Sequence, residues 1–424
     1  MTPHDSTEEI SADEARLLAL RAQGLLARVG ADRHPPSPSD GGADVLAMLH
    51  QVSAVQLDTI SVLARSHELV AYARLGPVGR KTVEHAYWGE PAQTFEYTGH
   101  AGCIFPLEMW PYFAFRRRAM QRRLGERVSG TSGASASRWR SVAATFDEVR
   151  ARLREGPVTA SELGGARGDA GIWWNWSAAK TGIELLYRLG EVVCTTRKSW
   201  KRIYDLPERA LPPDLLQREL SDEACFVYLV RRAAQALGVG SKRDIAAYFG
   251  LTTTWLGSPP NARRLLDTAI EACGLIPVRV EGWKEMAFLD PEVLGRDGAE
   301  EHRTTLLSPF DSLIWRGPVP PEGERSQRLF GFSLPFEPYV PRERRAHGYF
   351  SMALLAEGRL VGHVDPAREG RTLVARAVSL DDASAVDALA AALREAAAWV
   401  GCDAIRVERV EPPTAAIEII RAIS

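Results

Sequence analysis

The sequence predicts an α+β protein built from several domains, the last of them rich in strands. Two stretches, residues 139–212 and 220–300, show helical patterns followed by a predicted β-hairpin, and residues 301–424 carry several short strand patterns. The chain has 424 residues, of which 45% are hydrophobic and 25% charged. This composition is typical of globular proteins, and the length exceeds what one core supports, so we expect two to four domains.

Helical patterns dominate the predicted first domain, residues 10–125. Leucines at helical spacing follow a capping box formed by Ser11 and Glu14, which predicts a helix over residues 11–27. A Pro/Ser/Gly/Asp loop over residues 31–42 separates this helix from predicted helices at 44–51 and 66–75. Between the latter two, residues 54–58 predict an extended segment that runs directly into a helix. A Gly/Ser-rich stretch, residues 125–137, predicts a linker to the second domain.

The second predicted domain, residues 139–212, has the element order of a winged helix. We expect a first helix, a second starting at residues 159–163, a third over 178–189, and a hairpin of strands 191–196 and 201–206. The tip of that hairpin carries Arg197, Lys198, Trp200, Lys201 and Arg202. Cations and a flat ring suit a wing that contacts DNA. A surface turn with a packed Trp is an equally good interpretation.

The third predicted domain, residues 220–300, repeats this order of elements without repeating the sequence. Helices are expected over 222–237, 242–249 and 261–273, with strands 275–280 and 285–289 around Gly282 and Trp283. The remaining mixed α/β portion, residues 301–424, is expected to hold a meander of strands at 351–355, 358–365 and 371–378. A helix over 383–400 and a final strand and helix follow.

Composition excludes several classes of protein. No run of about eighteen apolar residues predicts a membrane span, and the polar N-terminus does not resemble a secretion signal. The five scattered cysteines have neither metal-ligand nor disulfide spacing, so we expect a cytoplasmic protein without a metal site or cofactor. The formal net charge is −2, yet residues 109–156 hold eleven arginines and only four acidic residues. Such segregation suits a phosphate-facing surface or, equally, a solvated helix face.

Gln56-Leu57-Asp58 is the strongest candidate for chemistry. In an extended segment, residues i and i+2 point to the same face, so the amide of Gln56 and the carboxylate of Asp58 would project together. Such a pair can hold a water molecule beside a general base, which suffices to hydrolyse a bond with a good leaving group. The structural alternative is ordinary, because an Asp before Thr commonly caps a helix.

The chain resembles the bacterial winged-helix DNA glycosylases that repair interstrand crosslinks, some of which protect producers of DNA-alkylating antibiotics. Several short segments, in the same order along the chain, carry the resemblance. They are residues 14–16 with 23–25, 55–62 with Arg65, His67 and Arg74, 95–101, 105–108, 204–209, 307–311, 339–341 and 360–365.

The resemblance implies three tandem winged helices that form a concave surface for duplex DNA, with Gln56 and Asp58 as catalytic residues. One branch of the family has Gln at both positions. The Asp of this chain is like that of the branch with broader crosslink repair. The implied enzyme is a monofunctional glycosylase for alkylated, cationic purines in double-stranded DNA, including interstrand crosslinks or bulky antibiotic adducts. Asp58 would stabilise the cationic transition state and deprotonate the water that Gln56 holds.

Three cations follow the catalytic pair within a few helical turns. We expect Arg65, His67 and Arg74 to contact DNA, although a salt bridge or a capped helix end explains each as well. The protein is expected to act as a monomer at the nucleoid. A non-enzymatic winged-helix DNA-binding protein or regulator is the main alternative. A lyase or nuclease is disfavoured, because no lysine occurs before residue 81 and no carboxylate cluster accompanies Asp58.

Overall fold

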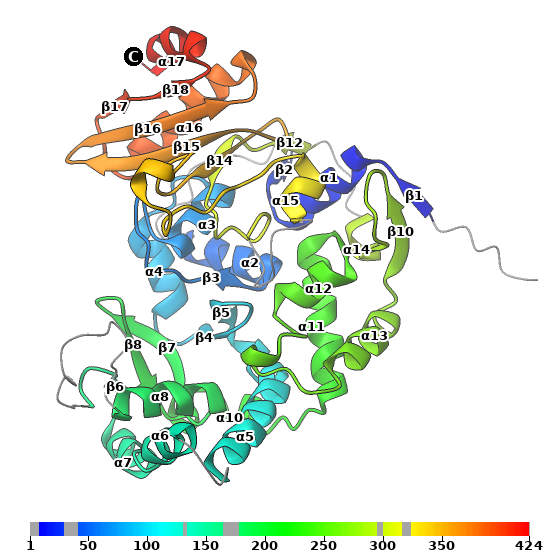
Figure 1. Cartoon of the computed structure of the whole chain (residues 1–424), viewed down its shortest axis with the longest axis vertical. Helices are drawn as coiled ribbons and strands as arrows, with labels where there is room; N and C mark the ends of the chain where they lie inside the picture. Colours follow the sequence, from blue (N-terminus) through cyan, green and yellow to red (C-terminus); the bar gives the residue numbers. More distant parts are fainter. Residues whose placement is uncertain are drawn as a thin grey trace, which may run out of the picture. The chain divides into compact units, whose positions relative to one another are not determined.

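The computed structural model describes residues 8–28, 41–129, 134–163, 178–294, 300–315 and 324–423 (Figure 1). The chain divides into two compact units. Unit 1 comprises Met1–Glu84, Arg231–Ile245 and Gly274–Ser424, and unit 2 comprises His85–Val230 and Ala246–Cys273. The predicted segments 10–125 and 220–300 therefore each contribute to both units, whereas 139–212 lies in unit 2 and 301–424 in unit 1.

Unit 1 contains both ends of the described chain. Its helices are α1 (Ala12–Ala22), α2 (Gly41–Val52), α3 (Ser66–Leu75), α14 (Pro291–Leu294), α15 (Arg325–Phe330), η3 (Arg342–Arg344), η4 (Ala383–Ala385), α16 (Val386–Trp399), η5 (Pro413–Ala415) and α17 (Ala416–Ile423). Its strands are β1 (Glu8–Ile10), β2 (Leu26–Arg28), β3 (Val55–Gln56), β9 (Val239–Ser241), β10 (Ile276–Val280), β11 (Ala287–Leu289), β12 (Glu300–His302), β13 (Thr305–Leu307), β14 (Met352–Ala356), β15 (Arg359–Glu369), β16 (Thr372–Leu380), β17 (Ala404–Val407) and β18 (Val410–Glu411).

Pairing between distant segments holds unit 1 together. Strand β1 lies parallel to β10, which continues through β11 to β9, and β2 pairs with β12. The largest sheet of the unit runs β13-β14-β15-β16-β17, and β18 also pairs with β16. Two hydrophobic clusters fill the interior. One lies between α3, the largest sheet and α16, and the other gathers α1, the β10–β11 hairpin and residues around α15.

Unit 2 contains the whole arginine-rich stretch, residues 109–156. Its helices are η1 (Leu107–Phe113), α5 (Ala114–Ser129), α6 (Ala134–Ala143), α7 (Phe146–Glu155), α8 (Ala178–Leu189), α9 (Pro207–Ala210), α10 (Pro213–Leu216), η2 (Thr254–Leu256) and α13 (Ala262–Ala272). Its strands are β4 (Thr94–Thr98), β5 (Gly102–Pro106), β6 (Val158–Thr159), β7 (Val193–Lys198) and β8 (Lys201–Asp205), hydrogen-bonded in the order β5-β4-β7-β8-β6. Three helices, α4 (Arg80–Trp88), α11 (Asp222–Leu237) and α12 (Lys242–Tyr248), run from one unit into the other.

Many predicted elements are confirmed. The predicted helices at 66–75 and 222–237 coincide with α3 and α11, and the predicted hairpins correspond to β7–β8 and β10–β11. The meander over residues 351–378 is present as β14, β15 and β16. These segments have strong hydrophobic periodicity and clear Gly turns, which are the most dependable local signals. The mixed α+β class is likewise confirmed.

The predicted linker over residues 125–137 is wrong for most of its length. Helix α5 continues to Ser129, and α6 begins at Ala134. The two helices pack on each other, and the guanidinium of Arg127 lies 4.8 Å from the ring centroid of Trp139. Tertiary packing of this kind overrides the weak helix propensity of Gly and Ser. The predicted loop at 31–42 falls largely outside the described residues. The helix expected to start at 159–163 is wrong at its start, because Thr159 belongs to strand β6 and residues 160–163 form a turn, and its continuation lies outside the described residues.

No helix in the described part of the chain is both long enough and apolar enough to cross a membrane.

Candidate active site and predicted DNA contacts

Gln56 and Asp58 lie on a short connection between β3 and α3. Strand β3 ends at Gln56, and the chain then bends through residues 57–65, where Ser61 and Arg65 form an isolated bridge. The helix expected directly after Asp58 is therefore wrong, since the described helix begins only at Ser66. Because the strand stops at Gln56, the same-face arrangement of Gln56 and Asp58 remains a prediction.

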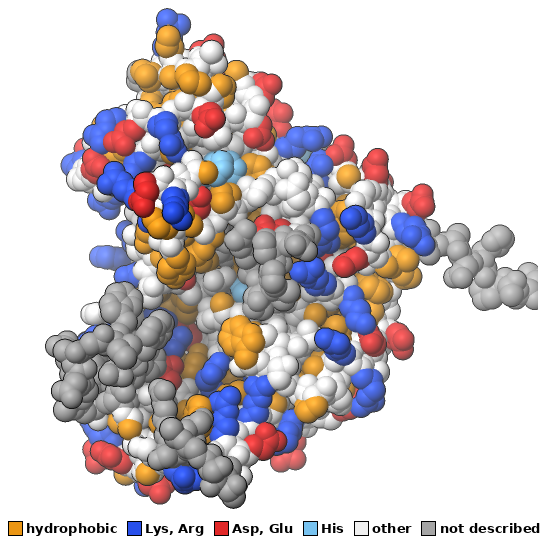
Figure 2. Space-filling view, in the orientation of Figure 1, with side chains coloured by type: hydrophobic (Ala, Val, Ile, Leu, Met, Phe, Trp, Pro, Cys, Tyr) orange, Lys and Arg blue, Asp and Glu red, His pale blue; other side chains and the backbone are white. Residues whose placement is uncertain are grey.

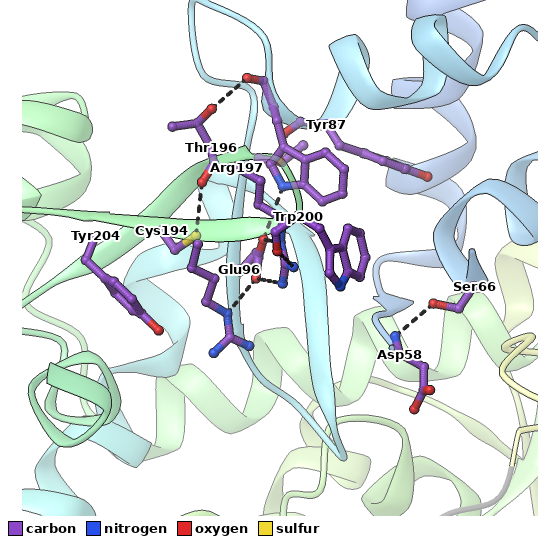
Figure 3. Close-up of polar contacts among 12 residues, drawn as sticks. Asp58, Ser66, Tyr87, Glu96, Cys194, Thr196, Arg197, Trp200 and Tyr204 are labelled. Carbon is purple, nitrogen blue, oxygen red and sulfur yellow. Dashed lines mark hydrogen bonds and ion pairs between the residues drawn. The ribbon is translucent and has the colours of Figure 1, made fainter. Parts of the chain in front are cut away.

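Two backbone hydrogen bonds fix Asp58 within this loop. Its N–H donates to Oγ of Ser66 over 2.9 Å, and the N–H of Ile60 donates to its Oδ1 over 2.8 Å. Figure 3 shows the Asp58 carboxylate turned away from Ser66. Ser66 is fully buried, and Ile60 and Val62 pack against the larger hydrophobic cluster of unit 1. The loop that carries Asp58 is thus anchored to the core through the residues that follow it.

The surroundings of Asp58 favour a carboxyl group with a raised pKa. Burial raises the pKa of Asp58, and hydrogen bonds from the backbone of Ile60 and Thr59 oppose that rise only in part. The side chain is half-buried, as is that of Gln56. A carboxylate has about four acceptor sites, so the bond from Ile60 leaves capacity for a water molecule. Such a group can serve as a general base or stabilise a cation close to it.

Helix α3 holds the three predicted cations in different environments. Arg65 occupies the N-cap position just before α3 and is half-buried, and its backbone N–H donates to Oε2 of Glu68 over 2.7 Å. His67 is completely buried. Arg65 therefore keeps an accessible side chain, whereas His67 offers no surface to DNA in this structure.

Arg74 is buried and lies in an ion pair instead of at the surface. Its guanidinium donates to both carboxylate oxygens of Asp311, at 2.6 and 3.0 Å, and to Oε1 of Gln23 at 2.7 Å. The side chains of Arg74 and Asp311 are 1% and 0% exposed. The expected DNA contact of Arg74 is therefore contradicted, because a buried bidentate ion pair leaves the guanidinium no access to a phosphate.

One group in the described residues has the composition of a metal site. Ligand atoms of His67, Glu68 and Glu84 all lie within 4.8 Å of one another. However, Arg80 donates to Oε1 and Oε2 of Glu68, at 2.6 and 3.1 Å. The Arg80 guanidinium thus already supplies positive charge to the Glu68 carboxylate of this group.

The predicted DNA-contacting wing is the β7–β8 hairpin, and its five residues divide into two sets. Lys198 and Lys201 are exposed at the tip. The other three are Arg197, Trp200 and Arg202, which contact other residues of unit 2. Figure 3 shows Arg197 and Trp200 beside Glu96. The ring of Trp200 packs edge-on against Trp88, and the Arg197 guanidinium lies 4.2 Å from the Trp200 ring centroid. The packed-Trp interpretation therefore describes this ring.

Glu96 on β4 binds both arginines of the wing. Arg197 makes two hydrogen bonds to the Glu96 carboxylate, and Nε of Arg202 donates to Oε2 over 2.9 Å. Glu96 is only 1% exposed. Burial acts to raise the pKa of Glu96, but the hydrogen bonds and charges of Arg197 and Arg202 outweigh it and hold that pKa below its ordinary value. The predicted DNA contacts of Arg197 and Arg202 are thus replaced, in this structure, by an internal ion-pair network.

The arginine-rich stretch is likewise part interior and part surface. Arg116 is buried and donates to the carbonyls of Thr98, Gly99, Phe249 and Gly250. Burial lowers its pKa to about 10. Other arginines of the stretch remain exposed or half-exposed, among them Arg122, Arg123 and Arg127. The eleven arginines and four acidic residues of this stretch give it a net charge of +7, and only part of that charge faces solvent.

Two residues of the site were not identified from the sequence. Ser66 looked like an ordinary first residue of a helix, and Glu96 like one polar position in an aromatic-rich strand. Eight residues separate Ser66 from Asp58, and about a hundred separate Glu96 from its arginines. Contacts over such sequence separations do not follow from local periodicity, so no sequence signal pointed to them.

Comparison with known proteins identifies the class. Residues 49–399 match the family described as DNA glycosylase AlkZ-like. This range covers most of the chain and includes Gln56 and Asp58. The chain therefore belongs to the AlkZ-like DNA glycosylase family, and it is a DNA glycosylase that acts in DNA repair. The non-enzymatic alternative is set aside.

A solved structure gives the same answer at the level of fold. The DNA glycosylase AlkZ of Streptomyces sahachiroi superposes with a TM-score of 0.57, at 19% sequence identity, over 95% of this chain and 100% of that chain. The similarity covers nearly the whole length of both proteins, so the two chains share a fold.

Proposed function

We propose that the protein is a monofunctional glycosylase that hydrolyses the N-glycosidic bond of alkylated, cationic purines in duplex DNA. The observation that supports this most directly is the anchored position of Asp58. Its amide is held by Ser66 and its Oδ1 by the amide of Ile60, while burial raises its pKa. A fixed, half-buried carboxylate suits a reaction in which positive charge develops on the sugar.

The chemistry follows from the charge of the substrate. Alkylation at a ring nitrogen makes the purine cationic, so the base departs as a neutral molecule and needs no strong general acid. Asp58 stabilises the oxocarbenium-like sugar and accepts a proton from the attacking water. Gln56 orients that water, donating through its amide N–H and accepting through its carbonyl oxygen. Water adds to C1′ and the base leaves, so an abasic site remains.

The proposed substrates include interstrand crosslinks and bulky antibiotic adducts. A base tethered to the opposite strand cannot be extruded into a deep pocket without breaking that tether. Three tandem winged helices with a concave DNA-binding face would avoid this difficulty, since they would read the lesion from a groove. We propose this arrangement with Arg65, Lys198 and Lys201 as phosphate contacts, because these side chains remain accessible. The working species is proposed to be a monomer.

The decisive experiment is single-turnover excision from a duplex that carries one 7-methylguanine, with abasic sites revealed by alkali. Asp58→Asn and Asp58→Ala are expected to slow excision by about 100-fold or more, and Gln56→Ala by a smaller factor. Asp214→Asn, which alters an exposed carboxylate on α10, is the matched control and should excise at the wild-type rate. Wild-type rates in both Asp58 variants would overturn the proposed role of Asp58.

Two further arms define the reaction and substrate. Strand cleavage without alkali, or trapping of the enzyme on DNA by borohydride, would contradict a monofunctional mechanism. Excision from a duplex with a defined interstrand crosslink, compared with the same monoadduct, measures whether crosslinks are substrates. Absence of crosslink unhooking alongside normal 7-methylguanine excision would restrict the proposal to monoadducts.

A further inference from the structure

A cavity in unit 2 combines arginine and tryptophan side chains. It has a volume of about 500 Å³ and lies between α5, α6, α8 and η2. Arg123 and Arg127 on α5 and Arg188 on α8 contribute its cations, while Trp139 on α6 and Trp255 on η2 contribute its rings. None of these residues was assigned to catalysis or to DNA contact above.

The lining of this cavity has a single sign of charge. No acidic side chain is among its lining residues, all of which belong to the described part of the chain. Three guanidinium groups around one cavity produce a positive potential that favours an anionic occupant. Figure 2 shows Lys and Arg side chains gathered beside hydrophobic ones on the part of the surface where α5 lies. Guanidinium groups also match the geometry of phosphate oxygens better than ammonium groups do.

The two tryptophans differ in their availability. Trp139 is half-buried and faces the guanidinium of Arg127 at 4.8 Å. Trp255 is 60% exposed, which is unusual for so large an apolar side chain. It sits on a single helical turn, after which Gly257 adopts a left-handed conformation with φ of 97°. The floor of the cavity is apolar and includes Leu185, which is 7% exposed.

We propose that this cavity binds an unstacked nucleotide of a DNA strand. Its base stacks on Trp255, and its flanking phosphates lie against Arg123, Arg127 and Arg188. An acidic peptide would satisfy the arginines but has no need of an exposed indole, whereas every nucleobase presents a π-face. The inference rests on the proposed function in taking DNA as the ligand. It adds a second contact point, carried by other residues than the Asp58 loop and the β7–β8 wing.

The test measures binding and catalysis separately, on the full chain. Fluorescence anisotropy compares affinities for an undamaged duplex with one unpaired nucleotide and for the same duplex fully paired. Trp255→Ala and Arg127→Ala are expected to weaken binding to the bulged duplex by roughly tenfold. Trp255→Phe should retain most of the affinity, because the ring remains. Each arginine removed should also flatten the dependence of log K on log salt by about 0.7 to 0.9.

Arg122→Ala is the matched control, because Arg122 is an exposed arginine of α5 that does not line the cavity. It should leave the preference for the bulged duplex unchanged. Equal affinity of Trp255→Ala and wild type for the bulged duplex would overturn the proposal. The proposal would also be overturned if Trp255→Ala lost more affinity for an acidic peptide than for the bulged duplex. Melting curves establish that the variants are folded.

Excision at saturating enzyme distinguishes this proposal from that for Asp58. The Trp255 and Arg127 variants should reach saturation only at a higher enzyme concentration, because the proposed site binds the DNA, whereas Arg122→Ala should saturate and excise 7-methylguanine as wild type does. If wild type binds the bulged duplex through Trp255 but excises nothing, the proposed substrate fails and the nucleotide site stands. If excision is normal and Trp255→Ala binds normally, only the nucleotide site fails.

Discussion

The backbone N–H of Asp58 donates a hydrogen bond to Oγ of Ser66, the first residue of α3, over 2.9 Å. This contact closes the loop between β3 and α3 and ties the candidate catalytic carboxylate to a buried position. The loop is therefore held by the same core that packs α3 against the largest sheet of unit 1.

Replacement of Ser66 should affect both stability and rate. Ser66→Ala removes the acceptor and leaves the Asp58 N–H without this partner, which should cost about 1–3 kcal/mol of unfolding free energy. Displacement of the carboxylate should slow single-turnover excision by about tenfold to a hundredfold. Urea unfolding and excision kinetics check the two effects. Ser61→Ala, in the exposed part of the same loop, is the control and should change neither.

Neutralisation of Asp58 should raise stability at neutral pH while it abolishes most activity. Burial raises the pKa of Asp58 in the folded state, so folding favours the protonated carboxyl. The associated stability is present below the unfolded pKa, near 3.9, and is lost as pH rises through the folded pKa. Asp58→Asn cannot ionise. Its melting temperature should therefore be higher than that of wild type at pH 7 and equal to that of wild type near pH 3. A lower melting temperature than wild type at pH 7 would contradict this.

The same raised pKa should appear in the pH profile of excision. The base form of Asp58 is lost as pH falls through its folded pKa, so the acidic limb should lie above the range of an ordinary aspartate, about 3.9. The residual activity of Asp58→Asn should show no such limb. An unchanged acidic limb in that variant would assign the titration to another group.

The Glu96 network should be a determinant of stability in unit 2. Glu96→Gln removes the buried carboxylate that pairs with Arg197 and Arg202 and leaves the nearly buried Arg197 charge without it, which should cost about 3–5 kcal/mol at pH 7. The pKa of Glu96 is lowered, so its contribution is present above the unfolded pKa, near 4.3, and is lost as pH falls through the folded pKa. Urea unfolding at pH 7 and at low pH should show the difference shrinking with acid.

The exposed lysines of the wing should behave differently from its arginines. Lys198→Ala and Lys201→Ala should leave stability nearly unchanged but weaken DNA binding and reduce its salt dependence, because both side chains are exposed. Arg197→Ala should mainly lower stability. A large stability loss in the lysine variants, or an unaltered salt dependence, would argue against a DNA-contacting wing.

Arg74 offers a direct test of its structural assignment. Arg74→Ala leaves Asp311 buried and unpaired, and should cost about 3–5 kcal/mol of unfolding free energy. Arg65→Ala, at the half-buried start of the same helix, should instead weaken DNA binding with little loss of stability. A stable Arg74→Ala variant with reduced salt dependence of binding would restore Arg74 as a DNA contact.

Local sequence determined most of the secondary structure and the identity of the candidate catalytic pair. Helices α3 and α11 and the two hairpins follow from hydrophobic periodicity, which encodes which face of each element is buried. The resemblance of Val55–Val62 to crosslink-repair glycosylases singles out Gln56 and Asp58 from the sequence alone. The family to which the chain belongs confirms the enzyme class.

The tertiary structure decided which charged residues are accessible for contact with DNA. Arg74, Arg197 and Arg202 looked as suitable for DNA as Lys198, but buried partners from distant segments, Asp311 and Glu96, bind them. It also placed Ser66 beneath Asp58 and brought Trp139 and Trp255 to one cavity. The physical reason is that burial and ion pairing depend on contacts between residues far apart in sequence. Periodicity reports only which way a side chain points within its own element.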